Sequence, residues 1–208
     1  MDRHLVIFAR APRIGAVKRR LAAGIGEVAA WRFAFVTADR LLRRLAVPGR
    51  WRCWLAVTPD RFQRRGRFWP EHAGRCPIHR LAQGPGDLGR RMARVLASLP
   101  PGPVVIIGTD IPDITPGHIS SAFRALGRNQ VVFGPAEDGG YWLVGARRRP
   151  KNPDFMAPRL FKRVRWSTSF ALADSRANLA PGIPVALLET LSDIDDCRAF
   201  ERWRQRRR

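Results

Sequence analysis

Residues 104–115 read VVIIGTDIPDIT, and they contain the clearest strand signal in the chain. Val104–Ile107 consists entirely of β-branched residues, a pattern typical of a strand that is buried on both faces of a sheet. We therefore expect this strand at the centre of the sheet. Asp110 follows shortly after it, so its carboxylate is expected at the carboxyl end of the strand, where ligands bind in open α/β sheets.

On both sides of this segment, short apolar runs alternate with longer helical patterns, which indicates an α/β fold with helices on the faces of the sheet. The other predicted strands are 4–9, 51–57, 78–81, 131–133, 141–144 and 184–188. The predicted helices are 27–46, 88–99, 117–126, 168–178 and one that begins at Cys197. The Pro- and Arg-rich segment 147–165 is expected to be irregular.

The length of 208 residues suits one compact domain, so we predict a single domain over 1–208 that ends in a helix and basic tail at 195–208. The three cysteines have no C-x-x-C spacing and the four histidines form no helical pair, so the pattern favours neither a zinc site nor a disulfide framework. The apolar run near the N-terminus is too short for a signal peptide or a membrane span. A cytoplasmic protein is therefore expected.

The net charge of +21 suggests another class of protein, a noncatalytic protein that binds polyanions such as nucleic acid. The distribution of the charge argues against this class. All but three of the 38 basic residues are Arg, and they are scattered among Ala, Gly and Pro along the whole chain. Because no basic stripe is apparent, nucleic acid is not expected as the main partner.

The first predicted strand leads into FARAPRIGAVKRRL, residues 8–21, which combines a glycine with several cations. A loop of this kind that leads into a helix can direct backbone N–H groups and cationic side chains at phosphate. The candidate phosphate-binding residues are Arg10, Gly15, Lys18 and Arg20. The Gly-Lys-Ser/Thr order of a Walker motif is absent, and an ordinary basic turn explains the spacing equally well.

Two acidic segments supply candidate metal ligands. Asp110 could hold Mg²⁺ or Mn²⁺ together with diphosphate oxygens, or it could simply cap a turn. The second segment is SDIDD, in which Asp193 and Asp195 precede a helix that Asp196 is well placed to cap. Asp193 and Asp195 would then be free to complete a metal site, although an acidic helix start accounts for them equally well.

GPAEDGGYWLVG, residues 134–145, places Glu137, Asp138, Gly139 and Gly140 between two predicted strands. A hairpin turn needs only the Asp-Gly pair, so the second glycine suggests that another group approaches the backbone closely there. The motif is therefore either a tight hairpin or a turn whose backbone contacts a bound group.

QGPGDLGRRM, residues 83–92, opens a predicted helix with glycines and an aspartate. In one interpretation Asp87 caps this helix. In the other, the backbone around Gln83, Gly86 and Asp87 packs against the nucleobase or ribose of a nucleotide. The spacing is compatible with both.

Taken together, these motifs resemble a known family. FARAPRIGAVKRRL, QGPGDLGRRM, VVIIGTDIPDIT, GPAEDGGYWLVG, WSTS at 166–169 and SDIDD follow the order found in a bacterial family of glycosyltransferase-A-like (GT-A) nucleotide-diphospho-sugar transferases. Some of its members are labelled arsenosugar biosynthesis glycosyltransferases. The resemblance covers nearly the whole chain. It implies a single-domain Rossmann-like GT-A fold, with a mostly parallel mixed sheet, helices on both faces, and a nucleotide diphosphate bound with a divalent metal at the carboxyl edge.

The resemblance also implies roles for individual residues. Asp110 would bind the metal and act in catalysis with Asp138, and Asp193 or Asp195 would complete the metal shell. The residues expected to bind the nucleotide and its phosphates are Arg10, Gly15, Lys18, Arg20, Gln83, Gly86 and Asp87, and those expected on the acceptor or sugar side are Glu137, Gly139 and Gly140. The chain departs from the family pattern at Arg10, Arg19 and Asp196, where Lys, Thr and Thr are common.

The activity implied is metal-dependent transfer of a sugar from a nucleotide-diphospho-sugar to a small acceptor. Negative charge develops on the diphosphate as the sugar leaves, and a metal at Asp110 would stabilise it together with Lys18 and Arg20. Asp138 would act as the general base or orient the acceptor hydroxyl. The nearest alternative is a guanylyltransferase-like nucleotidyltransferase that uses a nucleoside triphosphate and releases pyrophosphate. The sequence makes no prediction of the oligomeric state.

Overall fold

The strands of the protein form one sheet. The computed structural model describes residues 2–63, 69–73, 76–148 and 157–206. Within these ranges the sheet has eight strands in the order β3-β4-β2-β1-β5-β7-β6-β8. The strands are β1 (His4–Arg10), β2 (Arg52–Thr58), β3 (His72–Ala73), β4 (Cys76–Ala82), β5 (Val104–Ile107), β6 (Val131–Pro135), β7 (Tyr141–Ala146) and β8 (Val185–Leu187).

The central strand is the one that the sequence predicts. β5 lies between β1 and β7, and all four of its residues are buried. It pairs in parallel with β1 and antiparallel with β7, while β1 with β2, β2 with β4, and β6 with β8 are parallel. Because β7 is antiparallel to both neighbours, β5 and β6 point the same way. The carboxyl ends of β1, β2, β4, β5, β6 and β8 therefore share one edge of the sheet.

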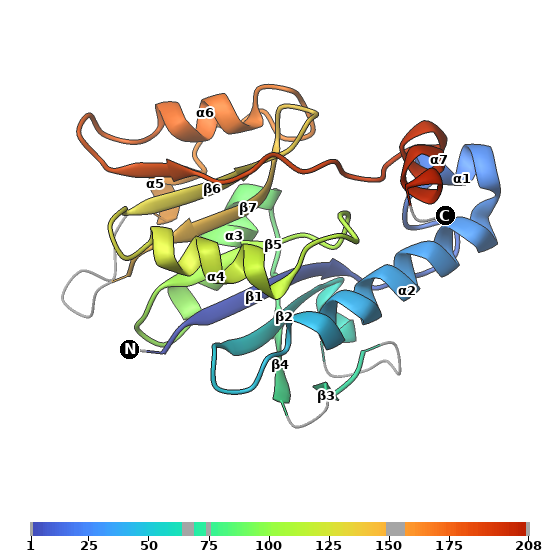
Figure 1. Cartoon of the computed structure of the whole chain (residues 1–208), viewed down its shortest axis with the longest axis horizontal. Coiled ribbons are helices and arrows are strands. Elements are labelled where there is room, and N and C mark those ends of the chain that lie inside the picture. Colours follow the sequence, from blue (N-terminus) through green and yellow to red (C-terminus); the bar gives the residue numbers. More distant parts are fainter. Residues whose placement is uncertain (1, 64–68, 74–75, 149–156, 207–208) are drawn as a thin grey trace.

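Helices cover both faces of this sheet, as predicted (Figure 1). They are α1 (Arg19–Ile25), α2 (Glu27–Leu45), α3 (Leu88–Ser98), α4 (Pro116–Ala125), α5 (Ala157–Leu160), α6 (Ala171–Ala177) and α7 (Cys197–Gln205), with a short 3-10 helix at Asp60–Phe62. Alternate residues of β1 face opposite sides, since Leu5 and Ile7 pack in one apolar core with α2 and α4, whereas Val6 and Phe8 pack in a second core with α3. This alternation is the two-residue period of a strand. None of the described helices is long and apolar enough to cross a membrane.

Among the described helices, α3, α4 and α7 start with side-chain caps, and the sequence had offered Asp87 and Asp196 as two of them. The Asp87 carboxylate accepts a hydrogen bond from the Arg90 N–H at the start of α3, and the Asp196 carboxylate caps α7 in the same way. Thr115 caps α4 in a capping box, with proline at the first helical position. These short-range interactions set where the helices begin.

The structure differs from the predicted elements mainly in short segments. Helix α1 was not predicted, because it is only seven residues long and begins inside the basic segment 8–21. The predicted helix 168–178 is shortened to Ala171–Ala177, since the Thr168 hydroxyl bonds to the Arg165 carbonyl and the Phe170 N–H in a turn ahead of it. Helix α5 lies within the segment 147–165 that was expected to be irregular, and 149–156 lie outside the described residues.

Candidate active site

A large cleft runs along the carboxyl edge of the sheet. Its volume of about 750 Å³ is in the range of pockets that hold small molecules and cofactors. The cleft brings together the ends of β1, β2 and β5, the turn between β6 and β7, the start of α3, and the segment before α7. The predicted site residues that line it are Arg10, Arg20, Gln83, Gly86, Asp87, Asp110, Asp138, Gly140, Asp193 and Asp195. Gly15, Lys18, Glu137 and Gly139 are not among its lining residues.

The segment before α7 carries two of the acidic residues into the cleft. Leu191 hydrogen-bonds with the backbone at the end of β6. Three residues later the Ile194 N–H donates to the carbonyl of Asp110 at 3.1 Å, and the Ile194 side chain is buried. Asp193 and Asp195 flank Ile194, so this hydrogen bond brings the segment that carries them to Asp110. Lys18 then bridges Asp195 and Asp110, while Asp193 interacts with Asp195 and Asp138.

Lys18 lies between two of these carboxylates. Its Nζ is 2.5 Å from Oδ1 of Asp110 and 2.7 Å from Oδ1 of Asp195, and only 8% of its side chain is exposed. Its backbone has φ 50° and ψ 46°, the left-handed region that costs a residue with a Cβ about 1 kcal/mol or more. The surroundings therefore hold Lys18 in an unfavourable conformation, which is common at functional sites. Lys18 lines a second hollow, of about 380 Å³, together with Arg10, Arg20, Asp110 and Asp195.

The charges of this cluster shift two pKa values. Burial alone would lower the pKa of the Lys18 ammonium, but the carboxylates of Asp110 and Asp195 outweigh burial and hold its pKa above the usual value. Burial, and then the charges of Asp195 and Asp138, raise the pKa of Asp193 to about 6. The carboxylates thus repel one another, and a cation placed among them would be stabilised.

The cluster fits a metal that arrives with a ligand better than one held by protein alone. In the described part of the chain, no three His, Cys, Asp or Glu side chains are grouped so that they could hold a metal ion. The cation between Asp110 and Asp195 is Lys18. Mg²⁺ usually takes only one or two carboxylates together with substrate phosphates and waters, and this set of oxygens meets that need.

Residues 8–21 contribute two arginines to the cleft lining, whereas Gly15 in the same segment does not line the cleft. Arg10 and Arg20 are exposed on the cleft, and a guanidinium nitrogen of Arg10 lies 3.5 Å from the Ala16 carbonyl. Gly15 has φ +74° and faces the Glu27 carboxylate, away from the cleft lining. Its role in the structure is to let the loop turn, because a residue with a Cβ would be strained there.

The segment that begins at Gln83 supports the cleft from inside the protein. The Gln83 side chain is 3% exposed, and its Nε2 donates to the carbonyls of Ala9 and Ala56, which ties β1 to β2. Asp87 uses one carboxylate oxygen to cap α3, as the simpler interpretation predicted. Both residues still line the cleft. The amide nitrogen of Gln83 is engaged within the chain, so only its oxygen remains for a ligand.

The motif 134–145 is a hairpin whose turn also faces the cleft. β6 and β7 pair antiparallel, and Asp138 in the turn accepts a hydrogen bond from the Gly140 N–H at 2.8 Å. Glu137 is exposed and points outside the cleft lining. A Cβ on Gly139 would lie 2.3 Å from the Ser169 carbonyl oxygen. The close approach that the second glycine suggested is therefore real, but the approaching group is the chain itself, at Ser169, and it meets the first glycine of the pair.

We predict that Gly139→Ala destabilises the protein more than Gly182→Ala. Both glycines have φ near +80°, but nothing lies within 4 Å of a Cβ on Gly182. Gly182→Ala therefore measures backbone strain alone, about 1 kcal/mol. Gly139→Ala adds the clash with Ser169 and should lower the free energy of unfolding by about 3 kcal/mol. Urea denaturation of both variants checks this, and equal losses would contradict the observed contact.

Several residues in the cleft were not predicted as site residues. Arg91 lines it, and its guanidinium donates to the Gly86 carbonyl at 2.7 Å and to the Thr58 hydroxyl at 3.4 Å. Trp166 lines it as well, with its ring close to Gly89 of α3, and so do the two residues that follow it in the WSTS motif. The sequence offered a signal for each residue. Arg91 lies one helical turn after the Asp87 cap, and WSTS is one of the motifs that carry the family resemblance, although it was given no role.

Both the sequence and the structure of this chain are similar to those of known proteins. Residues 41–168 match a family described as uncharacterized proteins conserved in bacteria, DUF2064. No curated protein matches the sequence. A protein of Desulfovibrio desulfuricans G20, provisionally described as a nucleotide-diphospho-sugar transferase, has a similar structure with a TM-score of 0.75 and 25% identity. The match covers 94% of this chain and 84% of that protein.

Two further solved structures share the fold at lower identity. The 4-diphosphocytidyl-2C-methyl-D-erythritol synthase of Anaerococcus prevotii has a TM-score of 0.64 at 11% identity, over 100% of this chain and 96% of its own. Rv0371c of Mycobacterium tuberculosis H37Rv, in complex with manganese, has a TM-score of 0.52 at 13% identity, over 97% of each chain. The predicted α/β fold and the family resemblance are both confirmed. The chain belongs to the bacterial family DUF2064, with the fold of the nucleotide-diphospho-sugar transferases.

Proposed function

We propose that this protein is a transferase that uses a nucleotide-diphospho-sugar as donor and transfers the sugar to a small acceptor with the help of Mg²⁺ or Mn²⁺. One observation carries the proposal: Lys18 and the carboxylates of Asp110 and Asp195 converge at the carboxyl edge of the sheet, beside a cleft of about 750 Å³. A cation between two carboxylates, next to arginines, suits a diphosphate that brings a metal with it. The similarity to the Desulfovibrio protein supports the same class of donor.

The cations around the cleft are suited to bind the diphosphate. Arg10 reaches it from the end of β1, Arg20 from α1 and Arg91 from α3. As the sugar leaves, negative charge accumulates on the diphosphate, and fixed cations lower the energy of that transition state. Lys18 would pass from its carboxylates to the phosphate oxygens when the donor binds.

The carboxylates are suited to hold the metal. Asp110 would bind it on the β5 side and Asp193 or Asp195 on the other, in place of the contact that Lys18 now makes. The bound metal would supply Lewis-acid stabilisation of the leaving diphosphate. The manganese in Rv0371c supports a divalent ion in this fold.

The turn between β6 and β7 is suited to the acceptor. One carboxylate oxygen of Asp138 accepts the Gly140 N–H, which orients the side chain and leaves the second oxygen for the acceptor hydroxyl. We propose Asp138 as general base or orienting group. Glu137 and Gly139 would act through the shape of the turn, since neither lines the cleft.

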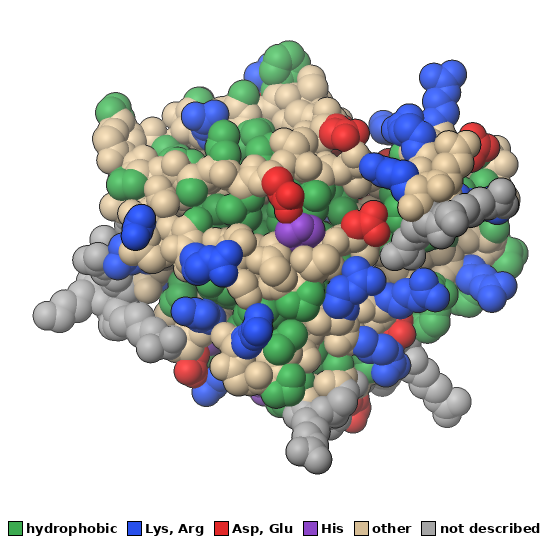
Figure 2. Space-filling view, viewed as in Figure 1, with side chains coloured by type: hydrophobic (Ala, Val, Ile, Leu, Met, Phe, Trp, Pro, Cys, Tyr) green, Lys and Arg blue, Asp and Glu red, His purple; other side chains and the backbone are tan. Residues whose placement is uncertain are grey.

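A nucleotidyltransferase is the second candidate. It is favoured by the shared fold of the Anaerococcus synthase, whose name describes a diphosphocytidyl product. The same cleft would then hold a nucleoside triphosphate, and pyrophosphate would leave. A noncatalytic polyanion-binding protein is less well supported, because Figure 2 shows basic side chains dispersed over the visible face among apolar and neutral ones.

The experiment that tests the proposal is a thermal-shift panel of UDP-, GDP- and dTDP-sugars against the free triphosphates, each with and without Mn²⁺. A ligand at about 100 times its Kd adds about 2.7 kcal/mol of stability, which raises the Tm of a chain this long by several degrees. We expect the largest shift with one nucleotide sugar and Mn²⁺ together. A larger shift with a triphosphate would favour nucleotidyl transfer, and no shift with any nucleotide would contradict both.

A further inference from the structure

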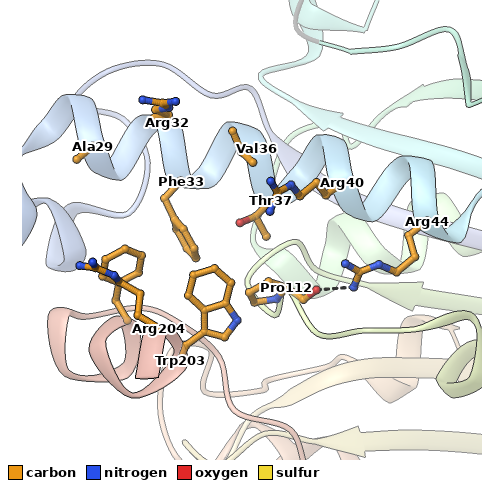
Figure 3. A pocket seen from close by; sticks show the side chains of 11 residues that line it. Ala29, Arg32, Phe33, Val36, Thr37, Arg40, Arg44, Pro112, Trp203 and Arg204 are labelled. Carbon is orange, nitrogen blue, oxygen red and sulfur yellow. Dashed lines mark hydrogen bonds between the residues drawn. The ribbon is translucent and has the colours of Figure 1, made fainter. Parts of the chain in front are cut away.

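A third pocket lies away from both the cleft and the hollow at Lys18, between α2 and α7. Its volume is about 330 Å³, and its lining shares no residue with the cleft (Figure 3). The lining comes from one face of α2, from Pro112, and from the last two turns of α7. We call it the α2–α7 groove.

The wall of the groove is aromatic. Phe33 on α2 meets Phe200 and Trp203 on α7 edge-on, with ring centroids 5.2 and 5.5 Å apart. Figure 3 shows Phe33 projecting from α2 toward the ring of Trp203. The Trp203 indole N–H donates to the Asp113 carboxylate at 3.4 Å, which holds the ring in place. All three rings are only half-buried, so part of each faces the groove.

The rim of the groove is basic. Arg32, Arg40, Arg44 and Arg204 line it, and none of the lining residues is acidic. Arg44 is engaged, since its guanidinium donates to the carbonyls of Pro112 and Ile114. Arg40 and Arg204 are exposed, and neither forms an ion pair with an acidic side chain in the described part of the chain; the Arg204 guanidinium lies over the Phe200 ring, 5.7 Å from its centroid.

We propose that the α2–α7 groove is a second binding site, for a small anion with a flat aromatic body such as an aryl phosphate. An aromatic ring on the ligand would pack against Phe33 and Trp203, and its anionic group would pair with Arg40 or with Arg204, which lie toward opposite ends of the groove (Figure 3). The volume suits a small molecule. A second copy of this chain is a poorer occupant, because two arginine-rimmed faces would repel each other.

The proposal is independent of the reaction in the cleft. Pro112 comes two residues after Asp110, and α7 begins two residues after Asp195, so the groove and the cleft share supporting segments. They do not share ligand-facing side chains. Loss of binding in the groove would therefore leave the proposed transferase activity standing, and the reverse holds as well.

The test uses naphthyl phosphate as the probe, measured by titration calorimetry on the whole protein. We expect one site in the wild-type protein. Naphthol and inorganic phosphate should bind more weakly, because naphthol has only the aromatic body and inorganic phosphate only the anionic group. The double variant Arg40→Gln with Arg204→Gln should weaken binding by about tenfold or more, since it removes both cations that could pair with the anionic group. The matched control is Arg43→Gln with Arg202→Gln, on the same two helices but outside the groove lining, and it should bind as the wild type does.

Two measurements keep the result specific to the groove. Lys18→Met, which alters the cleft, should leave the affinity for naphthyl phosphate unchanged. The indole ¹⁵N–¹H signal of Trp203, assigned with Trp203→Phe, should shift on titration. Equal affinity in the Arg40/Arg204 double variant, loss of binding in Lys18→Met, an unmoved Trp203 signal at saturation, or no binding at all would each overturn the proposal.

Discussion

Asp110→Asn lowers the turnover of the proposed transfer by about a thousandfold and leaves the protein folded. The substitution removes the charge that faces Lys18 and the proposed metal, and loss of one group that stabilises developing charge typically costs a factor of this size. The fold should survive because the Asp110 side chain is 56% exposed and Lys18 keeps its second partner, Asp195. Release of nucleoside diphosphate and of pyrophosphate measures turnover and also identifies which transfer takes place.

The control for this experiment is Asp39→Asn. It makes the same chemical change on α2, where Asp39 pairs with the exposed Arg43 at the surface. Its activity should equal that of the wild-type protein, and circular dichroism should show both variants to be folded. Full turnover by Asp110→Asn would remove the central element of the proposed function.

Phe133→Ala should lower the free energy of unfolding by about 4 kcal/mol. Phe133 on β6 is fully buried, and its ring meets Tyr141 of β7 edge-on at 5.2 Å between centroids. Truncation of a buried Phe loses its burial and leaves a cavity that the surrounding strands can fill only in part. Tyr141 lines the cleft, so the cavity lies directly behind its wall. Urea denaturation measures the loss.

Two further variants separate burial from residue type. Phe133→Leu should cost only about 1 kcal/mol, because most of the apolar volume is kept. Phe170→Ala should cost about 1 kcal/mol or less, since Phe170 is 50% exposed and its main contact is the guanidinium of Arg165 above its ring. Similar losses for Phe133→Ala and Phe170→Ala would show that the β6 core is less tightly packed than the structure describes.

Features that depend on neighbouring residues could be predicted from the sequence. The β-branched run places β5 in the centre of the sheet, because only a fully buried strand tolerates apolar residues on both faces. The caps Asp87 and Asp196 could be proposed because a cap acts on N–H groups within three residues of itself. The same locality places Asp110 at the end of its strand.

The short elements were missed for a related reason. α1 and β3 contain seven and two residues, too few for an apolar repeat to stand out from chance. Their positions depend on tertiary packing instead: Gly24 in α1, for example, lies so close to α7 that a Cβ there would be 2.8 Å from Cys197.

The sequence by itself determined the fold class, the central strand, the helix starts and the set of charged residues at the strand ends. Only the tertiary structure decided how those residues combine: Lys18 meets Asp195 across 177 positions of the chain, Gln83 turns inward to tie β1 to β2, and Gly15 stays outside the cleft. The physical reason is the distance along the sequence over which each interaction acts. Strand burial and helix capping act over a few residues, whereas an ion pair or a close backbone approach depends on where distant segments are brought by the hydrogen bonds of the sheet.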